Sequence, residues 1–226
     1  MTDFFSEDAS KVYDAKNKNL APIADTMHFL IRLILKDLPK DARILCVGVG
    51  TGAEILSLSR EYPAWNFVGV DPSAAMLNVC GERLKDAGLA DRCELIHGYV
   101  QDAPDDENFD AALSILVGHF VKREERADFY QQMTQRLKPQ GVLINTEISF
   151  DLDSAEFPSM FENWARIQTL MGATQESLKA LPKLLRDPLA VLPTQETERF
   201  IRDSGIKTPV RFFQAFMITG WYGRKE

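Results

Sequence analysis

The stretch that most constrains this chain runs from residue 43 to residue 54. Four apolar residues (44–47) lead into glycines at every second position, Gly48, Gly50 and Gly52, and a helical pattern of apolar residues follows at once. This order predicts a buried strand, a tight turn and the start of a helix. Glycines let a ligand approach the backbone closely, and the first turn of a helix offers free N–H groups. The turn therefore predicts a cradle for a nucleotide or cofactor.

A second predicted strand, 66–70, ends in Asp71, nineteen positions after Gly52. An acidic residue at the end of the second strand of a βαβ unit can accept hydrogen bonds from a ribose diol. The alternative is a structural turn followed by an aspartate that only caps the next helix. The glycine turn satisfies both G-x-G-x-G and G-x-G-x-x-A, so by itself it leaves S-adenosylmethionine and NAD(P) open.

Predicted strands and helices alternate along the middle of the chain. Strands are expected at 43–47, 66–70, 93–97, 109–114 and 141–147, and helices at 53–61, 73–88 and 122–137. This alternation predicts an α/β fold, an open sheet with helices on both faces. Helices are also expected at 6–17 and 20–38. We divide the chain into an N-terminal helical cap (1–40), an α/β core (41–150), a helical lid insertion (151–206) and a terminal strand pair completing the sheet (207–226).

Net charge, cysteine content and hydropathy indicate what kind of partner the protein binds and in which compartment it lies. The formal net charge of −7 argues against nucleic acid as a partner and favours a small molecule. Three cysteines without metal-ligand spacing predict a reduced, cytoplasmic protein and no metal site. No apolar run approaches the ~20 residues of a membrane span, and the N-terminus lacks the basic region of a secretory signal. The sequence is also compatible with a homodimer.

Four segments carry a family resemblance, namely 44–52, 68–77, 109–114 and 137–143. In this order they resemble the motifs of class I S-adenosylmethionine-dependent methyltransferases. The resemblance implies a Rossmann-like, seven-stranded sheet with helices on both faces, and S-adenosyl-L-methionine as cofactor. About forty residues before the first strand, a β-rich end, and the absence of Tyr-x-x-x-Lys after the glycine turn also favour this cofactor over NAD(P).

A narrower resemblance is to the carboxy-S-adenosylmethionine synthase group, through segments 147–150, 171–172 and 213–216. That group binds the extra carboxylate with an arginine in its helical insertion. The corresponding stretch here, 180–183, contains no arginine, and Arg186 is out of register. We therefore expect ordinary S-adenosylmethionine. The family also usually has an acidic residue two positions before the first glycine, where this chain has Cys46.

The resemblance implies a set of cofactor-binding residues. It places four residues around the methionine moiety of the cofactor, namely Gly48, Val49, Gly50 and Gly52. It places Asp71 on the ribose. Around the adenosine it places Pro72, Met76, Tyr99, Val100 and Gln101. Tyr13 of the N-terminal helix could close over the cofactor, or lie on a solvated helix face. Met76 could equally be part of the core.

Two further residues are expected near the reaction itself. Ligands of open α/β sheets bind beyond the carboxyl ends of the strands, which places Ser114 near the sulfonium, unless its hydroxyl only bonds nearby backbone. His119 could deprotonate an acceptor, because histidine titrates near neutral pH, or it could be structural.

These residues predict an enzyme that transfers a methyl group in line from S-adenosylmethionine to an O, N or C atom of an unidentified small molecule. Proximity and orientation would supply most of the rate, which requires neither a catalytic triad nor a metal. Three alternatives remain at this stage: a carboxy-S-adenosylmethionine synthase, an NAD(P)-dependent oxidoreductase and a non-catalytic cofactor-binding protein.

Overall fold

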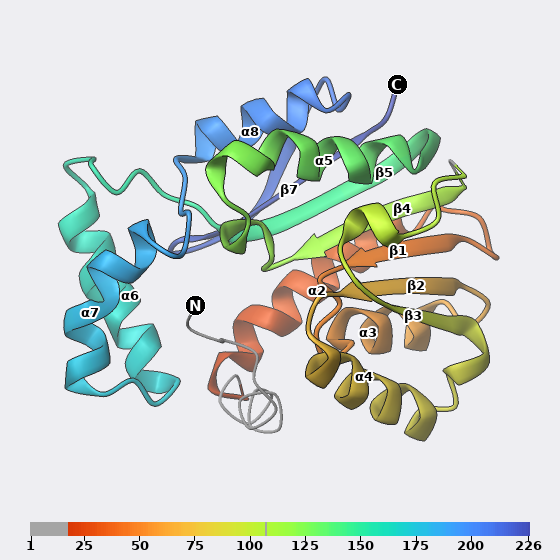
Figure 1. The fold of residues 1–226 in the computed structure, drawn as a ribbon, viewed down its shortest axis with the longest axis horizontal. Helices are drawn as coiled ribbons and strands as arrows, with labels where there is room; N and C mark the ends of the chain where they lie inside the picture. The colour runs from red at the N-terminus through yellow and green to blue at the C-terminus, as the bar shows by residue number, and fades with distance from the viewer. Residues whose placement is uncertain (1–17, 107) are drawn as a thin grey trace.

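The computed structural model describes residues 18–106 and 108–226 and is built on one seven-stranded sheet (Figure 1). The helix predicted at 6–17, with Tyr13, lies outside these residues. The strands are β1 (Arg43–Val47), β2 (Asn66–Asp71), β3 (Cys93–His97), β4 (Phe109–Ile115), β5 (Leu137–Ile148), β6 (Val210–Ala215) and β7 (Ile218–Arg224). Their order is β3-β2-β1-β4-β5-β7-β6. The first five are parallel, and β7 runs antiparallel to both β5 and β6.

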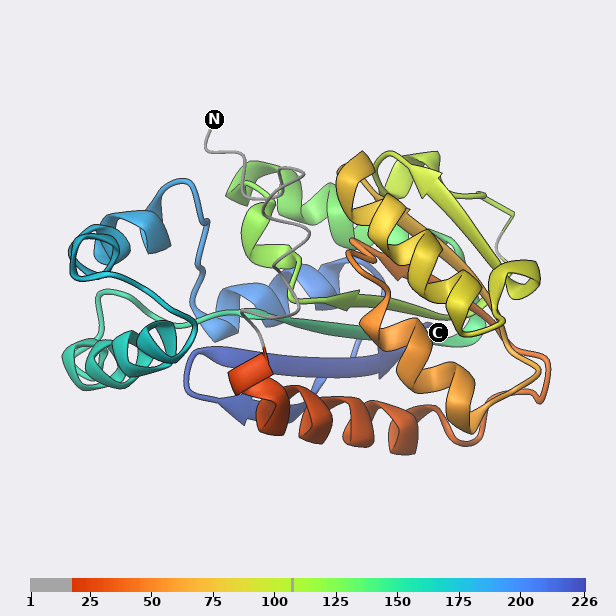
Figure 2. The same ribbon diagram turned by 90° about the horizontal axis from the view of Figure 1, so that it is seen from below.

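Helices cover both faces of the sheet (Figure 2). They are α2 (Ala21–Leu35), α3 (Ala53–Glu61), α4 (Ala74–Asp86), α5 (Arg126–Gln135), α6 (Phe157–Leu170), α7 (Gln175–Arg186) and α8 (Thr194–Asp203). Short 3-10 turns are η1 (Lys18–Leu20), η2 (Ala90–Arg92), η3 (Val100–Asp102), η4 (Gly118–Phe120) and η5 (Arg123–Glu125). Buried side chains of α2, α3 and α4 pack on one face, and those of α5 and α8 on the other. The predicted α/β fold is therefore confirmed.

The strand register brings the predicted site residues to one edge of the sheet. Val47, the last residue of β1, pairs with Val70 on β2 and with Ser114 on β4. The strand order reverses between β1 and β4, and ligands of open α/β sheets bind in the crevice at such a switch point. The glycine turn follows β1 directly, so it lies at this crevice.

The segment predicted as a helical lid, 151–206, divides into two parts. Helices α6 and α7 form a hairpin on the side toward which the arrows of β1 and β4 point (Figure 1). Trp164 and Ile167 of α6 and Leu181 and Leu185 of α7 are buried. By contrast, α8 packs against α5 on the sheet, with Ile201 buried there. We keep the name lid for the α6–α7 hairpin.

Two chain segments connect the lid to the core, and they lie side by side. Ser149 leaves β5 and pairs with Leu192 on the return path. The carbonyl of Leu192 accepts hydrogen bonds from Ser149 Oγ at 2.8 Å and from the N–H of Phe150 at 2.9 Å. We call these segments, residues 148–150 and 190–192, the neck of the lid.

A buried ion pair lies at the base of this neck. Arg126 and Glu147 have fully buried side chains, and Arg126 Nη1 donates to both carboxylate oxygens at 3.0 and 2.9 Å. Tyr130 and Thr197 each donate a hydroxyl to the same carboxylate at 2.8 Å. Arg126 Nη2 also donates to the carbonyl of Ala190 in the neck at 2.8 Å. The network therefore joins α5, β5, α8 and the neck.

No helix among residues 18–106 and 108–226 combines the length and the hydropathy needed to cross a membrane. The cytoplasmic location and the assembly state stay predictions.

Removing one partner of the buried pair should be strongly destabilising. We expect Arg126→Met to lower the free energy of unfolding by about 3–5 kcal/mol, because Glu147 is left as an uncompensated buried charge. Adding Glu147→Gln should restore part of this loss, since a neutral amide can still accept from Tyr130 and Thr197. Urea unfolding followed by circular dichroism measures both effects.

The matched control is Arg166→Met, because Arg166 forms an exposed ion pair with Glu162 on α6. Such pairs contribute about 0–1 kcal/mol. Equal losses at Arg126 and Arg166 would show that the buried network does not stabilise the fold.

Candidate active site

The glycine turn adopts a backbone that other residues avoid. Gly48, Gly50 and Gly52 have φ angles of +67°, +53° and +79°. A Cβ at Gly48 would lie 2.4 Å from a methyl of Val117, and one at Gly52 would lie 2.7 Å from Cys80 Sγ. At Gly50 the nearest described atom is 4.0 Å away. Packing thus requires glycine at 48 and 52, whereas at Gly50 residues 18–106 and 108–226 leave room for a ligand against the backbone.

Backbone N–H groups tie the turn to the end of β2. The N–H groups of Gly48 and Val49 both donate to the carbonyl of Val70, at 2.8 and 3.1 Å. The N–H group of Gly50 donates to Asp71 Oδ2 at 2.8 Å. The turn that follows β1 is therefore held in place by the last two residues of β2.

Asp71 is placed as a ribose ligand would need to be. The residue is 7% exposed, and its carboxylate accepts from the N–H groups of Gly50 and Ser73. Burial raises the pKa of Asp71, opposed by these two N–H bonds and by His97. A carboxylate has about four lone-pair positions, so two remain for a diol. The cradle and this acceptor fit S-adenosylmethionine, and the role of Asp71 stays a prediction.

The residues predicted around the adenosine lie between β2 and α4 (Pro72), on α4 (Met76), and at the start of η3 (Tyr99, Val100 and Gln101). Tyr99 is 61% exposed, whereas Val100 is buried, and Asp102 Oδ2 accepts from the N–H of Tyr99 at 2.7 Å. Asp102 therefore caps this turn. Pro72 and Gln101 are exposed, and Met76 is 2% exposed in the first turn of α4. Burial of Met76 agrees with the core alternative, and its contact with a cofactor stays a prediction.

Ser114 is buried within the sheet. Its side chain has no exposed surface, and Oγ has no hydrogen-bond partner among the described residues. Its neighbour on β5, Asn145, likewise has an Oδ1 without a partner in the described part of the chain. The sheet therefore buries two neighbouring polar atoms without a described partner, which is uncommon in a folded protein. Proximity of Ser114 to the sulfonium stays a prediction.

His119 lies in η4 and is 3% exposed. Its Nδ1 accepts from the N–H of Ile148 at 3.3 Å, and its carbonyl accepts from the N–H of Ala190 at 2.9 Å. Burial, and then the nearby Arg126 guanidinium, lower the pKa of His119 from 6.5 to about 3. A neutral ring whose Nδ1 is occupied in this way is poorly suited to act as a general base. The geometry favours the structural alternative, in which His119 holds the neck.

Glu54 is a residue of this site to which the sequence analysis assigned no role. It is 7% exposed in the first turn of α3, two residues after Gly52. The signal was present in the sequence, because Glu54 is four residues before the buried Leu58 and therefore shares its face of the helix. A charged residue on a buried helix face, directly after a ligand-binding turn, is a candidate site residue.

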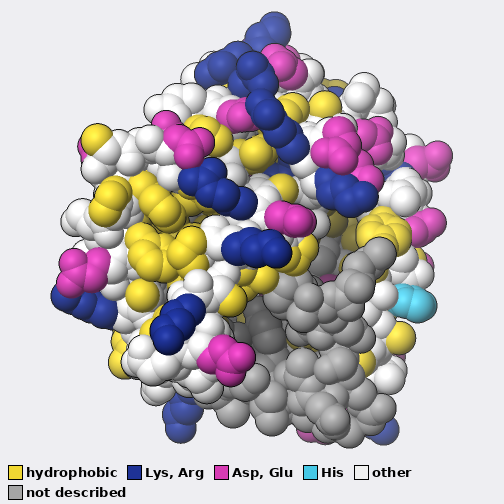
Figure 3. Space-filling model, turned by 60° about the vertical axis from the view of Figure 1, so that its left-hand side comes forward, with side chains coloured by type: hydrophobic (Ala, Val, Ile, Leu, Met, Phe, Trp, Pro, Cys, Tyr) yellow, Lys and Arg dark blue, Asp and Glu magenta, His cyan; other side chains and the backbone are white. Residues whose placement is uncertain are grey.

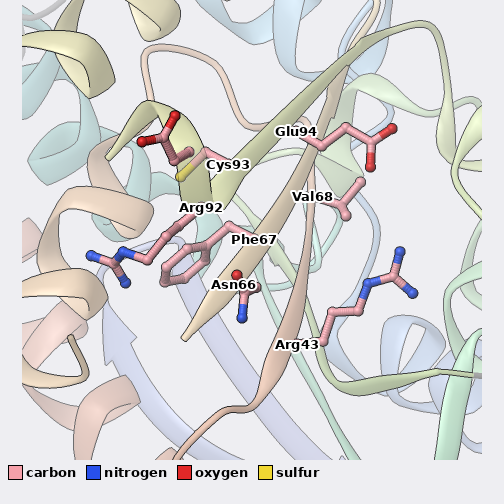
Figure 4. Close-up of a pocket in the computed structure, with 8 residues that line it drawn as sticks. Arg43, Asn66, Phe67, Val68, Arg92, Cys93 and Glu94 are labelled. Carbon is pink, nitrogen blue, oxygen red and sulfur yellow. The ribbon is translucent and has the colours of Figure 1, made fainter. Parts of the chain in front are cut away.

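A hollow of about 260 Å³ lies at the opposite edge of the sheet, at the amino ends of β1, β2 and β3 (Figure 4). Its cationic side chains have other partners. Arg43 forms an ion pair with Asp106 at 3.2 Å, and Arg92 donates to the carbonyl of Trp65 at 2.8 Å. Ligands of such sheets bind at the carboxyl ends, so we place the active site at the glycine turn.

Replacing Asp71 should weaken cofactor binding. We expect Asp71→Ala to raise the Kd for S-adenosylmethionine at least tenfold, about 1.4 kcal/mol, because the ribose loses its acceptor and the glycine turn loses the Gly50 bond. Calorimetric titration measures this Kd, with Asp86→Ala at the exposed end of α4 as control. An unchanged Kd would remove Asp71 from the binding site.

His119 should make the fold sensitive to acid. Its folded pKa lies below the unfolded value, so the stability it supports is present above pH 6.5 and is lost as the pH falls toward 3. The loss is up to about 1.4 kcal/mol per pH unit. We expect His119→Asn, whose Oδ1 can replace Nδ1 as acceptor, to flatten this dependence in urea unfolding at several pH values. A general-base role would instead appear as a loss of turnover of about a hundredfold or more.

Comparisons with known proteins agree with the fold and the cradle. Residues 44–141 match the family described as "Methyltransferase domain". The carboxy-S-adenosyl-L-methionine synthase of Wolinella succinogenes is 24% identical over 205 residues, covering 89% of this chain and 84% of that protein. The synthase of Campylobacter concisus is 25% identical over 212 residues, covering 90% and 86%.

Solved structures share the fold. A putative S-adenosyl-L-methionine-dependent methyltransferase of Methanococcus maripaludis has a TM-score of 0.68 at 18% identity, covering 98% of this chain and 94% of that one. Geranyl diphosphate C-methyltransferase of Streptomyces coelicolor, solved with S-adenosyl-L-homocysteine, has a TM-score of 0.67 at 12% identity, covering 94% and 84%. The methyltransferase domain at residues 44–141, the relatives and the shared fold together support a class I S-adenosylmethionine-dependent methyltransferase, with S-adenosyl-L-methionine as cofactor.

Proposed function

We propose that the protein transfers the methyl group of S-adenosylmethionine in line onto a small molecule with an apolar body. The bound cofactor supplies an electrophilic methyl group on a sulfonium. The protein then has to align the acceptor with this group and exclude water. In this proposal the glycine turn and Asp71 orient the cofactor, and the lid covers the acceptor.

The lid offers apolar side chains for such an acceptor. Trp164 and Ile167 are buried and belong to the large hydrophobic core cluster. Four other side chains are only partly buried, namely Phe157, Met160, Phe161 and Met171. Hydrophobic side chains gather on the face shown in Figure 3, with Lys and Arg side chains among them. Aromatic and methionine side chains are adaptable walls for an apolar ligand, so we assign these four to the acceptor site.

The hydrogen bonds of Arg186 are the observation that favours methyl transfer over the use of a carboxylated cofactor. It is the arginine nearest to the stretch where the synthase group has its carboxylate ligand. Here Arg186 Nη2 donates to the carbonyl of Leu152 at 2.9 Å and to Asp153 Oδ1 at 2.8 Å. Its guanidinium is thus used to fasten the end of α7 to the chain leaving β5, which supports ordinary S-adenosylmethionine.

A carboxy-S-adenosylmethionine synthase is the second candidate. Proteins with that name are similar to this chain over about nine-tenths of its length. The exposed lysines of α7, Lys179 and Lys183, offer positive charge in the same helix. This candidate keeps the same fold and the same cradle, and differs in the second substrate.

One experiment separates the two. Purified protein is incubated with S-adenosylmethionine and either a panel of small aromatic and aliphatic acceptors or prephenate, and products are identified by mass spectrometry. We expect S-adenosylhomocysteine and a methylated acceptor from the panel. Prephenate-dependent conversion of the cofactor into a form heavier by one carboxyl group would replace methyl transfer as the function.

Arg186→Gln sharpens this test. We expect it to leave methyl transfer within about twofold, because an exposed ion pair contributes little. Arg166→Gln in α6 is the matched control. Selective loss of prephenate-dependent activity in Arg186→Gln would indicate that Arg186 holds a carboxylate and would support the second candidate.

A further inference from the structure

We propose that Glu54 is the anionic partner of the α-ammonium group of the cofactor. This inference rests on the cofactor assigned above, and it does not depend on the identity of the acceptor. It gives a function to a buried acidic residue that the proposed reaction does not otherwise use.

Glu54 lies directly behind the glycine turn. It is the second residue of α3, and Gly52 at the N-cap of the same helix is packed against Cys80 of α4. The charged and titratable groups within electrostatic reach of its carboxylate come from the surrounding elements, namely Cys46 of β1, Asp71 of β2, and Cys80 and Arg83 of α4. The buried carboxylate therefore lies within electrostatic reach of the predicted ribose ligand.

Within the described part of the chain, the carboxylate of Glu54 lacks a paired cation. Among residues 18–106 and 108–226 it forms no ion pair within 4.0 Å, and Arg83 Nη1 donates to the backbone carbonyl and hydroxyl of Thr51 at 3.0 and 2.9 Å. Taking a carboxylate out of water without a paired cation is costly. S-adenosylmethionine brings cations to this crevice, because it carries both a sulfonium and an α-ammonium group.

The protonation states of the crevice agree with this pairing. Burial, and then the nearby Asp71 charge, raise the pKa of Glu54 to about 8, opposed by its own backbone N–H and by the more distant Arg83. Burial also raises the pKa of the Cys46 thiol well above its usual value and that of Cys80 to about 12, so both stay neutral. Without the cofactor, Glu54 holds a proton at neutral pH. An ammonium group placed beside it would favour the carboxylate.

Cofactor binding should therefore release a proton. The neutral carboxyl of Glu54 becomes a carboxylate paired with the ammonium, and its proton goes to the buffer. Below a pH of about 8 this release opposes binding, so the Kd should fall by up to about tenfold per pH unit as the pH rises toward that value. The effect should end where the ammonium of the cofactor itself loses its proton.

Calorimetry in two buffers of different ionisation enthalpy, at about pH 7, measures the protons released on binding. We expect the unchanged protein to release up to one proton on binding S-adenosylmethionine, and Glu54→Gln to release almost none, with a Kd that no longer depends on pH. A glutamine side chain has nearly the shape of a protonated glutamate, so the variant should fold. Glu61→Gln, at the exposed end of α3, should behave like the unchanged protein.

S-adenosylhomocysteine identifies the cation, because it keeps the ammonium and lacks the sulfonium. Equal proton release with both ligands supports the ammonium. Release with S-adenosylmethionine alone would overturn that assignment in favour of the sulfonium.

Asp71→Asn tests whether the other carboxylate, Asp71, is the source of the released proton. Release that persists in Glu54→Gln and disappears in Asp71→Asn would overturn the role of Glu54.

Failure of the inference is distinguishable from failure of the proposed function. If neither ligand binds the unchanged protein, the cofactor assignment itself fails. Tight binding with no release that depends on Glu54 overturns only the inference. A ligand-free readout tests its premise. The pKa of Glu54 is raised in the folded protein, so the stability that its protonated form supports is present at low pH and is lost as the pH rises from about 4.5 through about 8. Glu54→Gln should melt at a higher temperature than the unchanged protein at pH 8.5 and not at pH 5.

Discussion

The junction between the glycine turn and the end of β2 determines the shape of the candidate site. The N–H groups of residues 48 and 49 donate hydrogen bonds to the carbonyl of Val70, and the N–H of residue 50 donates one to the carboxylate of Asp71. The left-handed backbone that brings them there is accessible to glycine, and close contacts with Val117 and Cys80 exclude a side chain at the outer two positions. Because Asp71 both shapes the turn and is the predicted ribose ligand, cradle and ligand site depend on one carboxylate.

A second constraint acts at the base of the lid. The buried pair of Arg126 and Glu147 carries a desolvation cost, which is offset only because the carboxylate accepts from two hydroxyls and the guanidinium also donates to the neck carbonyl of Ala190. His119 adds two backbone bonds to the neck and stays neutral. The sheet that carries the glycine turn thus also anchors the lid, which we propose covers the acceptor.

Local patterns predicted the core of the fold well. The strands at 43–47 and 93–97 agree at both ends, and the helix predicted at 73–88 extends over 74–86. The fifth strand was expected from 141 and begins at 137, because Leu137 already pairs with Phe109 of β4 ahead of a register shift in which Gln140 has a φ of +65°. Part of the predicted lid became α8, whose packing on α5 depends on contacts that the helical pattern of 194–203 does not specify.

The sequence by itself determined the strand–helix alternation, the glycine turn and the acidic end of the second strand, because spacing and residue type express these features locally. Only the tertiary structure decided which polar residues are buried and what they contact. Glu147 bonds with Thr197, fifty residues away, and His119 with both sides of the neck. Glu54 is likewise an acidic residue in the first turn of a helix, a common position, and only its burial against α4 and the sheet distinguishes it. The protonation states and hydrogen-bond partners of these three residues depend on groups that are distant in the chain. Their chemistry therefore follows from the fold.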